Sequence, residues 1–134
     1  VDWMAAKENP FFAKALVNRL WGHFFGRGLV HEVDDLRETN PPSNPELMNQ
    51  LAREFVDAKF DVRRMIRLML VSRTYQLSSD PLPENQGDLQ NFARYYARRF
   101  PAEVVLDAID QATGHKTQFN NMSTQGRAID LPHE

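Results

Sequence analysis

One segment of the chain, residues 9–25, has almost no polar side when it is drawn as a helix. Apolar residues recur there in two neighbouring stripes at the spacing of an α-helix. Lys14, Asn18 and Gly22 form only a narrow polar seam beside the stripes. Because a helix that is apolar nearly all round belongs in a core, we predict that residues 10–25 form a helix enclosed by other helices or by another domain.

Residues that favour helix ends bound this segment. Asn9 can cap the helix, and Pro10 suits its first position. Gly26 and Gly28 follow the last turn, where glycine adopts left-handed backbone at little cost. We therefore expect the helix to begin at Asn9-Pro10 and to end at these two glycines.

A second helix is predicted after the proline-containing loop at residues 29–44. Pro45 suits the first helical position with Asn44 as the cap, whereas Ser43 with Glu46 would spell a capping box. We prefer the register in which Asn44 is the cap. The apolar positions that follow recur at helical spacing: Leu47, Met48, Leu51, Ala52, Phe55 and Val56.

Three further helices are predicted. Asp61 is a suitable cap for one that runs to about Tyr75, and the polar residues 78–88 form an exposed loop after it. Apolar residues at helical spacing predict another helix over residues 89–100. The last helix opens at Pro101, with four residues on its inward side: Val105, Ala108, Ile109 and Ala112.

The last helix ends at Gly114, and the polar residues 115–134 predict an irregular C-terminal tail. The predicted fold class is therefore all-α. We expect a compact bundle of about five helices that forms a single domain over residues 1–134. The chain begins at Val1 and stops soon after Leu131, so we expect it to be a fragment of a larger multidomain protein.

Composition narrows the classes of function. The 134 residues are 42% hydrophobic and 25% charged, which is typical of a globular domain. The formal net charge of −2 gives no bulk attraction to nucleic acid or to an anionic membrane. No apolar run reaches the roughly 18 residues that span a bilayer. The absence of cysteine excludes disulfides, thiolate nucleophiles and covalent haem attachment.

Two groups of residues have metal-ligating chemistry, but neither has the required pattern. His23 and His31 lie eight positions apart, whereas two ligands on one helix lie four apart. Oxygen-bearing side chains crowd the loop without the alternate spacing and central glycine of a calcium loop: Asp34, Asp35, Glu38 and Asn40. We predict no metal and no cofactor in this chain, and expect these acidic side chains to pair with arginines.

A set of arginines leaves a nucleic-acid role open as an alternative: Arg63, Arg64, Arg67, Arg73, Arg94, Arg98 and Arg99. Acidic residues alternate with them and the net charge is slightly negative, so solvated helix faces with ion pairs are favoured instead. No nucleophile elbow, dinucleotide fingerprint or phosphate-binding loop occurs in the sequence.

Several separate short motifs occur in the order typical of one family: Asn9-Pro10-Phe11-Phe12-Ala13, Val17-Asn18-Arg19-Leu20-Trp21, Phe25-Gly26-Arg27-Gly28-Leu29-Val30, Asp34-Asp35, Asn40-Pro41-Pro42-Ser43-Asn44-Pro45-Glu46-Leu47, Ser72-Arg73-Thr74-Tyr75, Ala102-Glu103, Asp107-Ala108 and Arg127-Ala128-Ile129-Asp130-Leu131-Pro132. Because of these motifs, the chain resembles PSD1 (DUF1553), a planctomycete-type surface domain of unknown function. The resemblance covers nearly the whole chain.

The resemblance implies a C-terminal part of a large, exported bacterial protein. It therefore implies an extracytoplasmic location, in the periplasm or at the cell surface. The implied partners are companion domains of the same full-length protein, often with a cytochrome c-like module that would carry the haem. No activity and no catalytic residue is implied, because none is established for the family.

The motifs and the loop between them contain one candidate functional cluster: Arg19, Arg27, His31, Asp34 and Asp35. Either arginine could pair with either aspartate through bidentate, charge-assisted bonds. Together with Asn18, Trp21 and the turn at residues 26–28, such a pair would fix how the first helix meets the acidic loop.

Three functions stay open at this point. The favoured one is a non-catalytic helical module that scaffolds or docks within a large extracytoplasmic protein. The second is part of an enzyme active site formed with a companion domain, in which the candidate cluster acts as acid, base or anion clamp. The third is a nucleic-acid-binding module that uses the arginines. For the isolated domain we expect no enzymatic activity.

Overall fold

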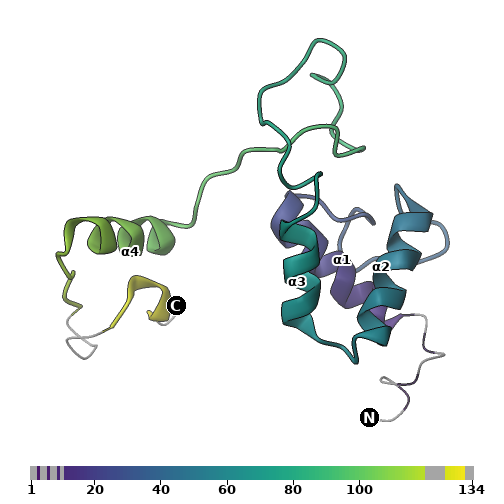
Figure 1. Cartoon of the computed structure of the whole chain (residues 1–134), viewed down its shortest axis with the longest axis horizontal. Helices are drawn as coiled ribbons and strands as arrows, with labels where there is room; N and C mark the ends of the chain where they lie inside the picture. The colour runs from purple at the N-terminus through teal and green to yellow at the C-terminus, as the bar shows by residue number, and fades with distance from the viewer. Residues whose placement is uncertain (1–2, 4–5, 7–8, 10, 120–125, 132–134) are drawn as a thin grey trace. The chain divides into compact units, whose positions relative to one another are not determined.

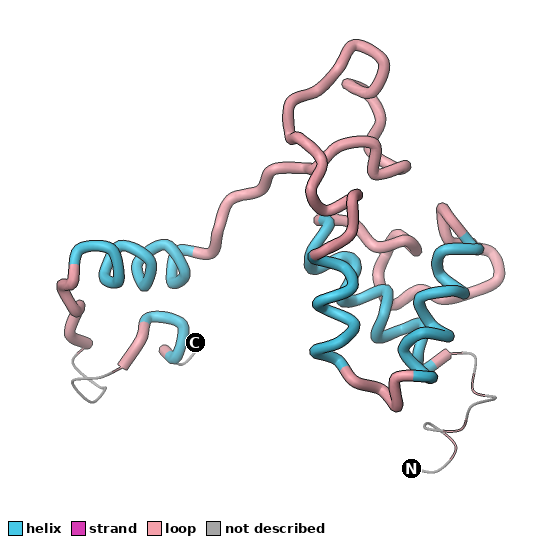
Figure 2. Tube along the Cα trace, in the orientation of Figure 1, coloured by secondary structure: helices cyan, strands magenta, loops and turns pink. Residues whose placement is uncertain are grey.

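The computed structural model describes residues 3, 6, 9, 11–119 and 126–131. Within these residues it is all-helical, with four α-helices and no strand (Figure 1, Figure 2). The elements are α1 (Phe12–Phe25), α2 (Pro45–Asp57), α3 (Val62–Leu70), α4 (Ala102–Thr113) and a short 3₁₀ helix, η1 (Ala128–Asp130). The all-α class is confirmed, and the expected number of about five helices is slightly too high.

The chain divides into two compact units, unit 1 (Val1–Ala97) and unit 2 (Arg98–Glu134). Unit 1 contains α1, α2 and α3, and unit 2 contains α4 and η1. The expectation of one domain over the whole chain stays a prediction. The expected irregular tail includes η1, and its residues 120–125 and 132–134 lie outside the described part of the chain.

Side-chain caps start α2 and α3 where the sequence predicts them. Asn44 Oδ1 accepts a hydrogen bond from the Leu47 N–H at 2.9 Å, which confirms the preferred register of α2. Asp61 Oδ1 accepts one from the Arg64 N–H at 3.0 Å. Each cap satisfies a backbone donor that has no partner inside the helix.

The ends of α1 are also fixed locally. Asn9 Oδ1 accepts hydrogen bonds from the N–H groups of Phe11 and Phe12, at 2.9 Å and 3.2 Å. Pro10 lies outside the described residues. Gly26 ends the helix in left-handed backbone, with φ of 84°, as predicted.

The core of unit 1 is built around α1, which packs against both α2 and α3 (Figure 1). Trp21 stacks on Phe25 with ring centroids 3.9 Å apart. Buried apolar side chains come from all three helices: Ala13, Val17, Trp21, Phe25, Met48, Leu51, Ala52, Phe55, Met65 and Met69. Removing this surface from water is the main favourable term in folding. The enclosure of α1 is partial, because Phe12, Arg19 and His23 are exposed.

The turn between α2 and α3 uses two left-handed residues, neither of them glycine. Lys59 has φ of 54° and Phe60 has φ of 61°. The ring of Phe60 lies edge-on to Phe55 at 5.3 Å and to Phe12 at 5.5 Å. Aromatic packing thus holds a backbone conformation that bulky residues rarely adopt.

The third helix ends at Leu70, earlier than the predicted end near Tyr75. Ser72 Oγ donates to the Met69 carbonyl oxygen at 2.6 Å and accepts from the Tyr75 N–H at 3.2 Å. A side-chain hydroxyl that bonds nearby backbone groups offers the chain an alternative to helix. The segment after α3 therefore continues as turns.

The helix predicted over residues 89–100 is not formed, so this prediction is wrong. Asp88 Oδ1 accepts a hydrogen bond from the Asn91 N–H at 3.0 Å and turns the chain. Phe92 follows in left-handed backbone, with φ of 54°. Its buried ring lies edge-on to Trp21 at 5.4 Å. This tertiary contact, rather than the local spacing, decides the conformation.

The side of α4 that was predicted to face inward is exposed, so this prediction is also wrong. Val105 is 42% exposed and Ile109 is 51% exposed, and the two alanines of the predicted set are exposed as well. Unit 2 packs the opposite, acidic side of the helix instead. Asp107 accepts hydrogen bonds from the N–H groups of Ala128 and Ile129, at 2.7 Å and 3.3 Å.

Candidate functional site

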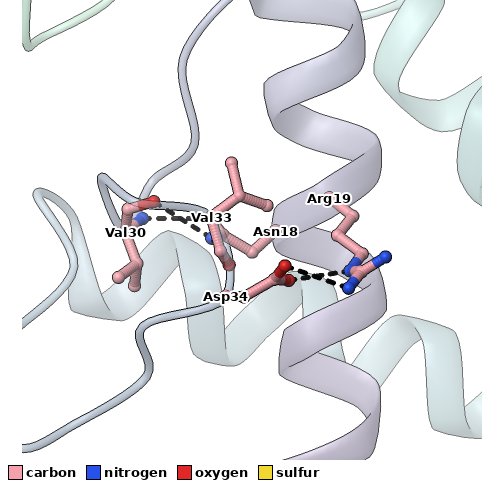
Figure 3. A network of polar contacts seen from close by, with 5 residues as sticks. All are labelled: Asn18, Arg19, Val30, Val33 and Asp34. Carbon is pink, nitrogen blue, oxygen red and sulfur yellow. Dashed lines mark hydrogen bonds and ion pairs between the residues drawn. The ribbon is translucent and has the colours of Figure 1, made fainter.

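The candidate site lies where α1 meets the loop after it, residues 26–44 (Figure 3). The polar seam of α1 faces this loop. Asn18 is 0% exposed, and a Cβ placed on Gly22 would lie 3.3 Å from the backbone nitrogen of Gly28. Two seam residues thus serve the contact with the loop rather than a solvated face.

The Asn18 side chain is the central polar group of this contact (Figure 3). Its Oδ1 accepts from the Val30 N–H at 2.9 Å, and its Nδ2 donates to the carbonyl oxygens of Val30 at 3.0 Å and Val33 at 2.8 Å. The amide therefore pairs with Val30 as a neighbouring strand would. Buried backbone groups need such partners, so Asn18 fixes the loop to the helix.

Gly28 is required by the close approach of this amide. The left-handed backbone expected at Gly28 is found at Gly26 but not at Gly28, which corrects the sequence interpretation. A Cβ on Gly28 would overlap the Val30 carbonyl oxygen and would lie 2.9 Å from Asn18 Oδ1. The physical reason for glycine here is therefore space, not backbone conformation.

A bidentate ion pair joins α1 to the acidic loop on its outer side (Figure 3). Arg19 Nε lies 2.8 Å from Asp34 Oδ1, and Arg19 Nη2 lies 3.0 Å from Asp34 Oδ2. Of the predicted pairings of Arg19 or Arg27 with Asp34 or Asp35, the structure thus forms this one. Both side chains are more than 60% exposed, at 62% and 67%, so the pair contributes little to stability.

Asp35 pairs with an arginine that the sequence interpretation did not consider. Arg37 Nε and Nη2 lie 2.6 Å and 2.7 Å from the two carboxylate oxygens of Asp35. The hydrogen bond from Arg37 holds the pKa of the Asp35 carboxyl below its ordinary value of 3.8. Asn40 braces the same turn, because its Nδ2 donates to the carbonyl oxygens of His31 and Asp35 at 2.8 Å and 3.0 Å.

The remaining two candidates make other contacts. His31 Nε2 lies 3.7 Å from Glu32 Oε1 at the exposed surface. Arg27 is half-buried, and its positive charge interacts with the phenol of Tyr96. Burial is the largest cause that raises the pKa of Tyr96 above 10.0, and the charge of Arg27 opposes this rise. The five candidates are therefore divided among separate interactions, and their role as one functional cluster stays a prediction.

This arrangement can hold a loop in place, and its chemistry suits that task. Asp34 and Asp35 each face a guanidinium in a fork geometry. A carboxylate whose pKa is lowered, as for Asp35, stays ionised at neutral pH and is a poor proton donor. The residues that carry the contact but were not in the predicted cluster are Asn18, Gly28, Arg37 and Asn40.

Replacing Asp35 with asparagine is expected to lower the melting temperature at neutral pH and to matter less in acid. The folded chain has the lower Asp35 pKa, so it binds this proton less readily than the unfolded chain does. The stability from the pair is therefore present above pH 3.8 and is lost as the pH falls further. Thermal unfolding followed by circular dichroism from pH 7 to pH 3 measures this difference.

Glu38→Gln is the matched control for this experiment, because it removes an exposed carboxylate from the same loop. The control should melt close to the unchanged chain across the whole range. A gap between Asp35→Asn and the unchanged chain that widens toward acid would contradict the assignment.

The described residues contain no group of three or more His, Asp or Glu side chains placed to hold a metal ion. None of their helices combines the length and the apolar character that crossing a bilayer would need.

Comparison with known proteins identifies the family. No curated protein and no solved structure shows significant similarity to the chain. The sequence profile of PSD1 matches residues 1–130, that is, nearly the whole chain. This match confirms the resemblance that the sequence motifs indicated. The chain therefore belongs to the PSD1 family, which is described as a protein of unknown function (DUF1553).

Proposed function

We propose that the chain is a non-catalytic interaction module that docks onto a companion domain of a larger extracytoplasmic bacterial protein. One observation carries the proposal: within unit 2 the apolar stripe of α4 is left uncovered. A surface helix ordinarily turns such a stripe toward a core. The companion domain and the extracytoplasmic location come from the family resemblance, and cell fractionation of the full-length protein tests the location.

The acidic side of α4 has a local reason to face inward. Asp107 accepts hydrogen bonds from two backbone N–H groups of η1, and its Oδ2 lies 3.5 Å from Arg127 Nε. Asp110 accepts from the backbone N–H and the hydroxyl of Thr117, at 2.7 Å and 3.0 Å. These bonds fix the rotation of the helix within unit 2 and leave its apolar stripe exposed, which supports its use as the docking surface.

The stripe has the chemistry of an interface centre. Val105, Ala108, Ile109 and Ala112 lie on one side of the helix and include no charged group. Contiguous exposed apolar surface marks interaction sites on soluble proteins. Charged residues are depleted at interface centres, so a charge placed here should oppose docking.

The double substitution Val105→Asp with Ile109→Asp is expected to weaken docking by at least about tenfold, because a buried, unpaired carboxylate is costly. The 134-residue chain and the rest of the full-length protein are prepared separately, and their association is measured by calorimetry. The melting temperature of the chain alone should change little, since both positions are exposed in unit 2.

Gln111→Asp provides the matched control, because it adds a carboxylate to α4 away from the stripe. This variant should associate as the unchanged chain does. Equal association of all three chains, or equal loss in both variants, would count against the stripe as the docking surface.

A further inference from the structure

A second feature of unit 1 is a pocket of about 260 Å³ between the start of α2, the side of α1 and the loop before residue 93. Its described lining carries no ionisable side chain. The lining combines hydroxyls and amides with apolar groups, among them Trp21, Leu29, Ser43, Thr74 and Asn91. Polar and apolar groups are thus mixed in the wall, so a bound molecule can form several hydrogen bonds there and still bury apolar surface.

One buried polar atom of a lining residue has no partner in the described part of the chain. Trp21 lines the pocket and is only 3% exposed, and its indole Nε1 finds no hydrogen-bond acceptor among the described residues. A buried indole N–H usually has a partner, and an unpaired buried donor is unfavourable. An acceptor from outside the chain would satisfy it.

The pocket wall beside the Trp21 ring includes a residue in an unfavourable backbone conformation. Phe92, which also lines the pocket, has φ of 54°, and its buried ring lies 5.4 Å from that of Trp21. The segment at residues 90–92 contributes three lining residues and is not part of a helix. Backbone strain of this kind concentrates at ligand-binding and switch regions.

We propose that this pocket binds a small uncharged ligand that carries hydroxyl or amide oxygens. One ligand oxygen accepts from Trp21 Nε1, and others bond the hydroxyls of Ser43 and Thr74. Because Nε1 is closed off from solvent, entry of the ligand displaces residues 90–92 and relieves the left-handed backbone at Phe92. The uncharged lining disfavours a charged ligand, which would lose hydration without gaining a counter-ion.

The indole N–H signals of the full chain test this proposal by ¹H–¹⁵N NMR. The chain has two tryptophans, and the exposed Trp3 serves as an internal control. Trp21→Phe assigns the signals. Acetamide and D-glucose are the uncharged probes, and acetate is the charged probe of the same shape as acetamide. Saturable movement of the Trp21 signal with acetamide or D-glucose, but not with acetate, supports the proposal and tells amide from hydroxyl recognition.

Any other pattern overturns it. A Trp21 signal that stays fixed with both uncharged probes indicates a site filled by water only, and equal movement of the Trp3 signal indicates a solvent effect. Thr74→Val, which removes one lining hydroxyl, should raise the saturation midpoint about threefold or more. Thr39→Val, in the acidic loop outside the pocket, should leave the midpoint unchanged.

Discussion

Replacing Asn18 with aspartate is expected to lower the free energy of unfolding of unit 1 by about 3–5 kcal/mol at neutral pH. The carboxylate has no donor, so the carbonyl oxygens of Val30 and Val33 both lose their bond to this side chain. It also places a negative charge at a position that is 0% exposed. Urea unfolding followed by circular dichroism measures the loss.

The pH dependence of this variant separates the two causes. Burial raises the pKa of a carboxyl group, so the folded variant binds a proton more readily than its unfolded chain. The deficit should therefore be largest at neutral pH and should shrink as the pH falls through the folded pKa. Asn49→Asp, on the half-buried side of α2, is the control and should cost much less. A loss that does not change with pH would argue against burial of the charge.

Replacing Gly28 with alanine is expected to lower the free energy of unfolding by about 3 kcal/mol, because the fold leaves no space for the added methyl group. It would overlap the Val30 carbonyl oxygen, which is backbone and cannot rotate away. It would also lie 2.9 Å and 3.0 Å from the two polar atoms of the Asn18 amide. Relief of either contact pulls the loop off α1 and breaks the hydrogen bonds to Val30.

Gly87→Ala is the matched control for this substitution. No atom lies within 4 Å of a Cβ built on Gly87, and its backbone is not left-handed. This control should be neutral or slightly stabilising, because alanine restricts the unfolded chain. Similar melting temperatures for the two variants would show that the backbone at Gly28 is not as close to Asn18 and Val30 as these distances indicate.

Helix boundaries could be predicted from sequence where a nearby side chain or a single backbone conformation decides them. Asn44 and Asp61 bond N–H groups three residues ahead, and Gly26 supplies the left-handed end of α1. These interactions are local, so spacing and residue type are sufficient. The end of α3 was predicted too late, because the Ser72 hydroxyl bonds backbone groups of Met69 and Tyr75 and so replaces helical hydrogen bonds there.

Tertiary contacts could not be predicted in the same way. Residues 89–100 have helical spacing, but Phe92 gains more from packing on Trp21 than the segment gains from helix. On α4 the apolar stripe predicted an inward side, yet Asp107 is held inward by backbone donors that lie far along the chain. Periodicity shows that a helix has two sides, and it does not show which side is covered.

At the candidate site, the ion pair could be predicted from the sequence, but the hydrogen bonds of the buried amide could not. Opposite charges predicted that Arg19 or Arg27 pairs with Asp34 or Asp35, and the Arg19–Asp34 pair is one of these possibilities. Asn18 was expected to help join the first helix to the loop, but its buried bonds were not predicted, because an amide in a helix has no sequence signal for its partners. Its partners are backbone groups of Val30 and Val33, and every residue has such groups.

The turn at Lys59 and Phe60 has a consequence for how unit 1 assembles. Two successive left-handed residues with full side chains are unfavourable in an isolated peptide. The ring that holds the reversal in place also needs Phe12 from α1. A peptide spanning only α2 and α3 should therefore not keep its hairpin in water, and the three helices are expected to form and melt in one cooperative step.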